Sequence, residues 1–429
     1  MQKVTTKALA KPAFIPWLIV GLGALYYCYE YFLRIVPSVM TPELMRAFNL
    51  DGLQIGALSA YYYHAYMPMQ ILVGLLMDRY GPRRLLTLAC FLCALGTFLF
   101  AGSHTLGVAE AGRFLVGMGS AFAFVGALKL ATVWLPPNRF ALVSGIITCL
   151  GMVGAMVGDI LLRAMVDAIG WKTALYLAAI VGVGLTLVLW AAIRDSNSYN
   201  ETPHHMTNFR TLLKGLWVAL KSPQIWLNGL VGLLLYLSLS AFAEMWGIPY
   251  LQQARGLSGD TAASANSLIF LGWAIGAPFW GWFSDYIRLR CLPITAASIS
   301  ALLLICVLLY VPGLPLPILY LLMFLFGLLS SVQILVFAVC RESAPMRIAG
   351  TAIALTNMIV MIGGNVFQPL VGKLLDMNWS GSFVDGARVY SNTAFEIALM
   401  VLPIGIFIAI MLMFFIRETH GELQDPIHH

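Results

Sequence analysis

Residues 74–84 have the sequence Gly-Leu-Leu-Met-Asp-Arg-Tyr-Gly-Pro-Arg-Arg, which ends an apolar run with an acid and continues into a basic turn. A related stretch, Gly281-Trp-Phe-Ser-Asp285, ends another apolar run 207 residues later, and Arg288 and Arg290 follow it. Two stretches of this kind at corresponding places in a long chain indicate an internal repeat. The sequence therefore predicts a protein built from two related halves.

Two more pairs of motifs repeat at nearly the same distance. They are Pro137-x-Arg139-x-Ala141 with Pro345-x-Arg347-x-Ala349 at an offset of 208, and Asp167 and Trp171 with Asp376 and Trp379 at offsets of 209 and 208. Three pairs at a nearly constant offset strengthen the prediction of a repeat, because each single match is weak.

Composition places the chain in a membrane. Of its 429 residues, 60% are hydrophobic and 10% are charged, against about 25% charged residues in soluble proteins. Apolar runs of roughly twenty residues, the length that crosses a bilayer as a helix, recur from end to end. We therefore predict an all-α membrane protein with twelve transmembrane helices, and a water-soluble enzyme is excluded.

The longest polar stretch divides the chain six helices plus six. It predicts an N-terminal six-helix bundle over residues 1–193, a cytoplasmic linker over 194–223 and a C-terminal six-helix bundle over 224–429. In this topology one side carries 16 Lys and Arg residues and the other carries 7. Cytoplasmic loops carry the excess of basic residues, so both termini are expected in the cytoplasm. The same bias accounts for the net charge of +6, so nucleic-acid binding is not needed to explain it and is not expected.

With these residues in place, the chain resembles the major facilitator superfamily. The loop 74–84 is similar to that family's signature between helices two and three, and Arg113-x-x-x-Gly117-x-Gly119 also resembles a family pattern. The resemblance implies two six-helix bundles, related by a pseudo-twofold axis, that rock about a central site. It assigns a conformational gate to Gly74, Asp78, Arg79, Gly81, Arg83, Arg84, Arg113, Gly281 and Asp285.

By analogy with the family, Asp78 faces the start of helix eleven near residues 348–351, and Asp285 faces the start of helix five near Arg139, when the cytoplasmic side is shut. A carboxylate at the positive N-terminus of a helix is stabilised there. The alternative is that these charges only orient the loops. In helix five, Asp159 stands where antiporters of the family often have proline, which disfavours a proton-driven drug exporter.

Charged side chains inside the predicted helices mark the candidate site. A charge at mid-bilayer costs about 2.5–3.5 kcal/mol on insertion scales, so such residues usually face a partner or a hydrated cavity. They are Glu30, Arg34, Lys129, Asp159 and Glu244. Glu30 and Arg34 are four residues apart and share a helix face, as do Asp159 and Arg163, which is consistent with two structural ion pairs.

The alternative to a structural pair is that Arg34 binds an anionic group of the substrate while Glu30 carries a coupling proton. Tyr31-Phe-Leu-Arg34-Ile-Val-Pro37 resembles the first helix of the organophosphate and organic-anion branches of the superfamily. In the organophosphate branch a second arginine in helix seven completes a phosphate clamp, whereas this chain has Ser240 there with Glu244 nearby. A carboxylate or a zwitterion is therefore a better expected substrate than a sugar phosphate.

The resulting candidate residues form two groups. We expect substrate binding by Arg34, Tyr27, Tyr31, Lys129, Glu244, Trp246 and Asn357. We expect proton coupling by Glu30, Asp159 and His64, with helix packing as the equal alternative for His64.

These residues predict a secondary active transporter that moves a small polar carboxylate-bearing solute, an organic anion or a zwitterion, by alternating access and with proton coupling. The alternatives are an exporter of amphipathic drugs or siderophores, a uniporter of amino acids or short peptides, and a receptor that binds a solute without moving it. The sequence shows no metal cluster, nucleotide loop or nucleophile–base motif, so no enzyme activity and no cofactor are expected. We expect a monomer in the inner (plasma) membrane whose partners are its solute, protons and lipid.

Overall fold

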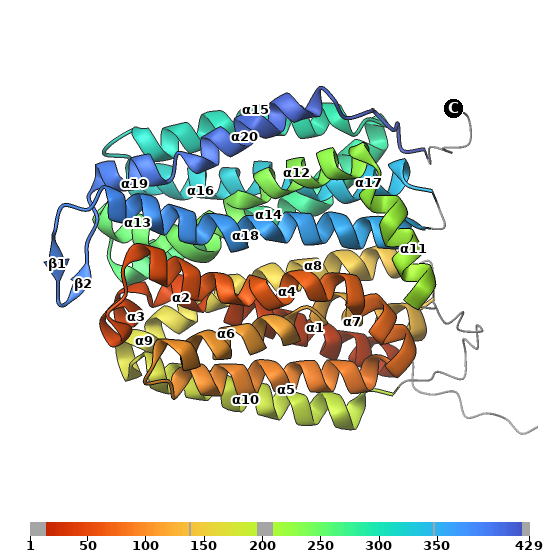
Figure 1. Cartoon of the computed structure of the whole chain (residues 1–429), viewed down its shortest axis with the longest axis horizontal. Coiled ribbons are helices and arrows are strands. Elements are labelled where there is room, and N and C mark those ends of the chain that lie inside the picture. The colour runs from red at the N-terminus through yellow and green to blue at the C-terminus, as the bar shows by residue number, and fades with distance from the viewer. Residues whose placement is uncertain (1–13, 137–138, 195–208, 346–347, 423–429) are drawn as a thin grey trace, which may run out of the picture.

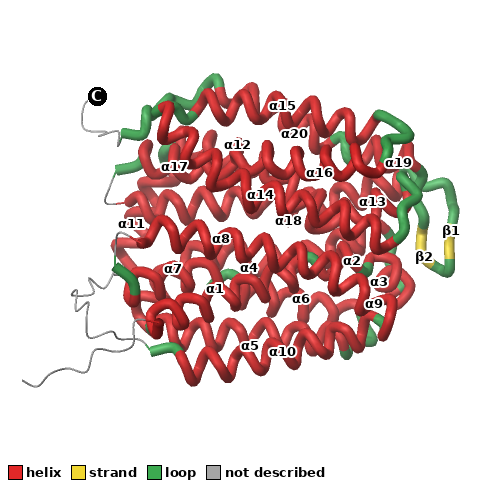
Figure 2. Tube along the Cα trace, turned by 180° about the vertical axis from the view of Figure 1, so that it is seen from behind, coloured by secondary structure: helices red, strands yellow, loops and turns green. Residues whose placement is uncertain are grey.

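The chain, in a computed structural model, folds into long α-helices that lie roughly along one axis (Figure 1). The structure describes residues 14–136, 139–194, 209–345 and 348–422. Within these ranges the β-structure is a short antiparallel hairpin of β1 (Phe383–Val384) and β2 (Ala387–Arg388), which projects from one end (Figure 2). We call that end the hairpin face, and the opposite end, where α1 begins and α20 ends, the terminal face.

The first half of the molecule comprises the described helices up to residue 192. In chain order they are α1 (Phe14–Arg34), α2 (Val36–Val39), α3 (Thr41–Phe48), α4 (Gly52–Tyr80), α5 (Pro82–Ala101), α6 (Leu106–Ser120), α7 (Ala123–Trp134), α8 (Phe140–Val157), the π-helical η2 (Gly158–Leu162), α9 (Arg163–Ile169) and α10 (Trp171–Ala192).

The second half follows a connecting helix, α11 (Phe209–Leu220). In chain order its elements are α12 (Pro223–Leu237), the π-helical η3 (Ser238–Trp246), α13 (Gly247–Gln253), α14 (Gly259–Ile287), α15 (Cys291–Tyr310), α16 (Leu316–Ser330), the 3₁₀ turn η4 (Ser331–Ile334), α17 (Leu335–Ser343), α18 (Ala349–Met377), α19 (Asn392–Ala398) and α20 (Val401–Met413).

Some consecutive elements, such as α6 and α7, continue one another as a single long rod. Grouped in this way, the described helices that cross the molecule form twelve rods. Among the described residues, ten helices or joined helices are long and apolar enough to span a membrane. The two rods outside that set are α1 and α4, which carry the charged and tyrosine-rich residues described below. The prediction of an all-α membrane protein is confirmed.

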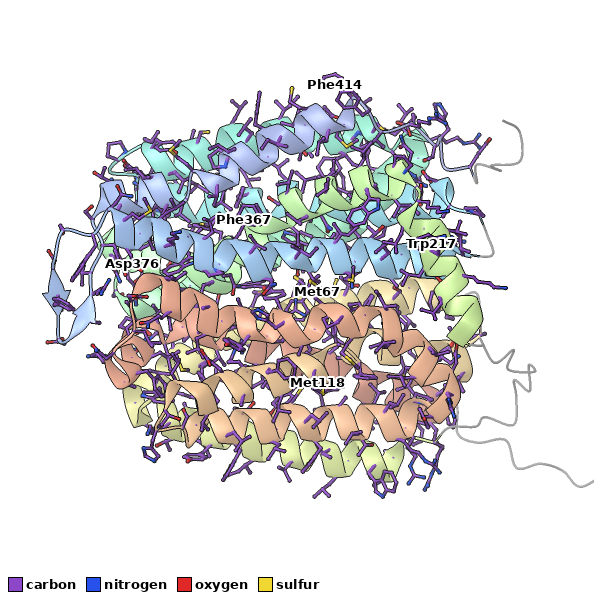
Figure 3. The ribbon with its side chains drawn as sticks, in the orientation of Figure 1. Met67, Met118, Trp217, Phe367, Asp376 and Phe414 are labelled. Atoms are coloured by element: carbon purple, nitrogen blue, oxygen red, sulfur yellow. The ribbon has the colours of Figure 1, made fainter. Side chains whose placement is uncertain are left out.

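The outer surface is apolar, as a lipid-facing surface must be. Large hydrophobic side chains point outward along the rods; Ile180 is 64% exposed and Phe414 is 76% exposed. Figure 3 shows Phe414 at the edge of the molecule, directed away from the bundle. Such residues are solvated by hydrocarbon chains and need no protein partner.

Each half packs mainly within itself, and two helix pairs join the halves. Helix α4 lies along α18 over much of its length, and α8 lies along α14. The predicted linker, residues 194–223, contains α11, while residues 195–208 lie outside the described residues. The division of the chain at these boundaries stays a prediction.

Candidate substrate site between the two halves

A proline determines where α1 ends. Pro37 has no amide hydrogen, so the carbonyl of Leu33 has no helical donor four residues ahead. The guanidinium of Arg113 on α6 fills this gap: Nη1 donates to the Leu33 oxygen at 2.9 Å and Nη2 to the Arg34 oxygen at 3.2 Å. Arg113 therefore fixes the backbone that carries Arg34. Arg113, which the resemblance assigned to the gate motif, thus supports the end of α1 at the candidate site.

Arg34 is the centre of the site. Its side chain is 2% exposed, and its Nη2 donates to Oε1 of Glu30 at 2.7 Å, which confirms the expected contact within α1. From the second half, Glu244 on η3 approaches to 3.6 Å between Oε1 and Nη1, and the Tyr236 hydroxyl accepts from Nη1 at 3.3 Å. Arg34 Nε is buried without a hydrogen-bond partner. One guanidinium therefore faces two carboxylates from opposite halves and keeps one free donor.

Tyrosines complete the surroundings of this ion cluster. The Tyr62 hydroxyl donates to Oε2 of Glu30 at 3.1 Å, and the Tyr63 hydroxyl donates to Oε2 of Glu244. The ring of Tyr31 lies 4.1 Å from the Arg34 guanidinium carbon, a cation–π distance. These hydroxyls and rings satisfy buried charges that water would otherwise solvate.

Two features of the cluster did not stand out in the sequence. Tyr62 and Tyr63 belong to a tyrosine-rich stretch of α4 that also contains His64. In the sequence nothing distinguishes them from His64, whereas in the structure both tyrosines are buried and His64 is exposed. Tyr236 has a clearer sign, because it follows Tyr27 by 209 residues (236 − 27), the same offset as the repeated motifs. Applying the repeat to the tyrosines of helix one would have found it.

The π-helical stretch η3 shapes the second half of the site. A π-helix widens the turn and often occurs at functional positions. Side chains of neighbouring helices bond its carbonyls: Gln368 Nε2 donates to the Ser240 oxygen at 2.6 Å, and Asn266 Nδ2 donates to the Ala243 oxygen at 2.9 Å. Glu244 follows directly, so its position depends on α14 and α18 as well as on its own helix.

Three more of the predicted binding residues make their contacts with residues other than Arg34. Tyr27 packs edge-on against Tyr31 with 5.1 Å between ring centroids. The indole Nε1 of Trp246 donates to the backbone carbonyl of Gln368 at 2.9 Å, a contact within the second half. Asn357 on α18 donates to Oε1 of Gln70 on α4 at 2.9 Å, which joins the two halves.

Two predicted residues lie elsewhere. Lys129 binds Asp78 at 2.7 Å near the terminal face, so the structure places it beside the gate motif and apart from the Arg34 cluster. His64 is on the exposed side of α4, where its Nδ1 lies 3.0 Å from the Ala60 oxygen and its ring contacts Tyr61. The structure therefore offers His64 no contact with the ion cluster.

Asp159 and Arg163 do not form the ion pair that their spacing suggested. Arg163 bonds Asp167, Glu43 and the Val39 oxygen. Asp159, on the π-helical η2, is fully buried and accepts a hydrogen bond from Asn266 of the other half at 2.7 Å. The π turn separates the two residues, and Arg163 finds nearer acids at the hairpin face.

At the terminal face the gate acids pair within their own halves. Asp78 binds Lys129, and Asp285 binds Arg290 at 2.6 Å. The start of α18, the partner expected for Asp78, instead packs against α11, where Gly215 lies beside Ile348 and Thr351. The other motif residues lie near the ends of α4 and α14, in the turn after α4 or in the first turn of α5; they are Gly74, Arg79, Gly81, Arg83, Arg84 and Gly281.

Arg290 also binds Glu342, and these hydrogen bonds raise the pKa of its guanidinium. Glu418 accepts from the backbone amides of Arg290 and Cys291 at 2.7 and 2.8 Å. Burial raises the pKa of the Glu418 carboxyl, but these and neighbouring amide donors outweigh burial and hold it below its ordinary value. The segment after α20 is thereby fastened to the start of α15.

At the hairpin face an acid joins the two halves. Asp376, near the end of α18, accepts from the amides of Gly52 and Leu53 at the start of α4, at 2.9 and 2.7 Å. Figure 3 shows Asp376 where these helices meet. Tyr390 and Arg388 bond the same carboxylate at 2.6 and 3.0 Å. Burial and the contact with Asp376 raise the pKa of the Tyr390 hydroxyl, which therefore stays a donor.

The space around the glycines also differs between the two faces. A methyl group on Gly372 would overlap the carbonyl of Gly52, so α4 and α18 touch backbone to backbone at the hairpin face. A methyl group on Gly74 or Gly350, near the terminal ends of the same two helices, would meet nothing within 4 Å. The halves are thus in closest contact at the hairpin face.

A buried ion cluster between two packed helical halves is the arrangement of a membrane solute transporter. Residues 22–369 match the Major Facilitator Superfamily, and the chain belongs to this family. The family and the relatives below are transporters, so the protein is a multi-pass membrane transporter and not an enzyme.

The relatives include carriers of small anions. Over 403 residues the chain is 25% identical to a probable sulfoacetate transporter of Cupriavidus necator, covering 90% of this chain and 85% of that protein. Over 417 residues it is 22% identical to a probable galactarate/D-glucarate transporter of Escherichia coli, covering 90% and 91%. A bacterial homologue of the human lysosomal transporter Spinster has the same fold, with a TM-score of 0.78, 15% identity and coverage of 95% and 97%.

Proposed function

We propose that this protein transports a small carboxylate-bearing organic anion or zwitterion by alternating access, with protons as the coupling ion. The observation that carries the proposal is the buried Arg34 between Glu30 of its own helix and Glu244 of the other half. An arginine at a site between the halves is suited to bind a carboxylate, because its planar fork matches that group. The sulfonate and carboxylate groups of the relatives' named substrates support an anionic solute.

Charge balance within the cluster suggests how protons enter the cycle. With both carboxylates ionised, the three side chains carry one net negative charge, which repels an incoming anion. When a substrate carboxylate takes the place of one acid on Arg34, the displaced acid remains in a buried site without its counter-ion. Burial of an unpaired charge is costly, so that acid takes up a proton. One bound anion would then be accompanied by at least one proton.

Glu30 is the acid that we assign to the coupling proton. Its bonds to Arg34 and Tyr62 lie within the first half, so they persist when the halves separate. The contacts of Glu244 with Arg34 and Tyr63 cross between the halves and must break as the site opens. Glu244 therefore leaves Arg34 together with its own half as the site opens, and Glu30 is the acid that stays beside Arg34 for the substrate carboxylate to displace.

We also propose that the protein lies in the inner (plasma) membrane with the terminal face in the cytoplasm. The excess of basic residues on that side supports this orientation. A solute receptor would use the same cluster, and it differs from a transporter in binding its solute without flux.

The test is uptake into proteoliposomes under an imposed inward proton gradient. The solutes are sulfoacetate, D-glucarate, galactarate, amino acids and dipeptides, and the variants are Arg34→Lys and Glu30→Gln. We expect gradient-stimulated uptake of at least one anion, and Arg34→Lys should weaken its binding about tenfold or more, equivalent to about 1.4 kcal/mol. Glu30→Gln should keep exchange of solute across the membrane while losing the response to the gradient.

Asp260→Asn is the matched control, because this exposed acid at the start of α14 lies outside the cluster. It should transport as the unchanged protein does. Unchanged uptake in both cluster variants would show that Glu30 and Arg34 form only a structural pair. Binding of a solute without uptake would replace the transport proposal with the receptor.

A further inference from the structure

Asp159 has an unusual position for an acid. Its side chain is fully buried on η2, in a rod that crosses the membrane. Oδ2 accepts a hydrogen bond from Asn266 Nδ2 on α14, at 2.7 Å, across the boundary between the halves. Oδ1 is buried and has no hydrogen-bond partner. Half of the carboxyl group is thus unsatisfied in the closed interface.

No cation among the described residues compensates this acid. The elements packed against η2 are α1, α2, α8, α9 and α14. Their charged residues are Glu30, Arg34, Arg163, Asp167, Asp260 and Asp285. None of these residues forms an ion pair or hydrogen bond with Asp159, and the nearest in sequence, Arg163, is bound to Asp167 and Glu43. The same is true of the other titratable groups there, namely the tyrosines and Cys28 of α1, Cys149 of α8 and Tyr286 of α14.

Asn266 connects Asp159 to the substrate site. The same Nδ2 that bonds Asp159 also donates to the carbonyl of Ala243 at 2.9 Å. Ala243 precedes Glu244 on the π-helical η3. Asn266 is therefore held by an acid of the first half, and it also stabilises the π-helical turn that places Glu244 next to Arg34.

We propose that Asp159 is a second proton-binding site, separate from the Arg34 cluster, and that it is protonated while Asn266 is docked against it. The proton resides on Oδ1, where it displaces no existing hydrogen bond, and it removes a charge that the closed interface leaves unpaired. When the halves part along α8 and α14, water reaches the carboxyl and the proton leaves to it. No bond other than this O–H forms or breaks.

This inference rests on the proposed proton-coupled transport and assigns it a residue outside the substrate cluster. It makes the stability of the closed interface depend on proton binding even when no substrate is present. A protonated Asp159 favours the docked arrangement of α8 and α14, whereas an ionised Asp159 favours their separation. Substrate binding at Arg34 and proton binding at Asp159 then act on the same pair of halves.

The experiment follows the protonation itself. The full-length protein in lipid nanodiscs is titrated by infrared difference spectroscopy, without any solute, in the region of the C=O stretch of protonated carboxylic acids. We expect a protonated-acid band in the unchanged protein that is absent from Asp159→Asn. Asn266→Ala should keep the acid but shift its band, because the Oδ2 hydrogen bond is lost.

An exchanged pair keeps the test decisive if the single variants fold poorly. Asp159→Asn combined with Asn266→Asp moves the acid to the other helix and should restore a protonated-acid band. Asp260→Asn is the matched control and should leave the band unchanged. A band that is equally strong in Asp159→Asn, or missing from the unchanged protein at every pH, overturns the proposal.

Transport separates this inference from the proposed function. With D-glucarate or sulfoacetate as the solute, Asp159→Asn should keep solute exchange and lose about tenfold or more of the gradient-driven accumulation, within the usual range of coupling between sites. If Asp159→Asn accumulates solute normally, the second proton site is wrong and the Arg34 mechanism stands. If no variant moves solute but the infrared band behaves as expected, the transport proposal is wrong and the proton site stands.

Discussion

The two faces of the molecule use acids at helix ends in opposite ways. At the hairpin face, Asp376 of the second half holds the amides of Gly52 and Leu53 of the first half. At the terminal face, Asp78 and Asp285 each bind a cation of their own half. The structure is therefore fastened between halves at one face and within halves at the other. The difference shows that a carboxylate near a helix end becomes a link between halves only where the backbones approach closely.

Asp376→Ala should produce the largest effect, because it removes two bonds to helix-terminal amides and the partner of Arg388 and Tyr390. Hydrogen bonds to charged groups contribute about 1.5–3 kcal/mol each. We expect faster hydrogen exchange at the amides of Gly52 and Leu53 and a lower melting temperature. The control is Asp167→Ala, the counterpart in the repeat, whose partner Arg163 lies in its own half. Equal exchange at the start of α4 in both variants would contradict the link.

Gly372→Ala should have the next largest effect. Its methyl group would overlap the Gly52 carbonyl, and such overpacking costs about 1–3 kcal/mol. Gly74→Ala is the matched variant at the terminal end of α4, where a methyl group meets open space. Since alanine favours helix by about 0.5–1 kcal/mol over glycine, Gly74→Ala should raise the melting temperature slightly. The melting temperatures of both purified variants measure this difference. Shifts of the same sign would contradict the closer contact between the halves at the hairpin face.

Lys129→Met should have a smaller effect on stability. The Lys129–Asp78 pair is partly exposed, and such pairs contribute about 0.2–1 kcal/mol. The variant frees Asp78 for the start of α18, as the sequence motif predicts, so hydrogen exchange in the first turn of α18 should slow. Thr132→Val on the same helix, which leaves the ion pair intact, is the control. Unchanged exchange at α18 would mean that Asp78 does not bind there.

Glu418→Gln should have a similarly small effect on stability, and this effect should depend on pH. The pKa of Glu418 lies below its ordinary value of 4.5, so the ionised carboxylate stabilises the folded chain above that pH, and the stabilisation is lost as the pH falls through the lowered pKa. A carboxylate at a helix N-terminus contributes about 0.3–1 kcal/mol. The melting temperature of Glu418→Gln should therefore be lower at neutral pH, and the difference should vanish in acid. A difference that grows in acid would contradict this assignment.

Much of the fold followed from the sequence because bilayer thickness and backbone hydrogen bonding leave few choices. Apolar runs of helix length predicted the rods, and the repeated motifs predicted two halves before any contact was known. Glu30 and Arg34 were also predictable as a contact, since residues four apart share one face of an α-helix.

Other contacts depended on which helix faces meet. The four-residue spacing of Asp159 and Arg163 failed because a π turn lies between them and Arg163 has closer acids at the hairpin face. Lys129 is charged and membrane-embedded like Arg34, but its helix directs it to Asp78. Spacing along a chain says nothing about these partners.

The sequence by itself determined the class of protein, its repeat and the pair on α1, because these depend on local chemistry and helix period. Tertiary structure alone decided that Glu244 and Tyr236 reach Arg34 from the other half and that Asn266 docks on Asp159. These contacts join residues more than a hundred positions apart, and their geometry is set by how whole helices pack and where π turns rotate side chains.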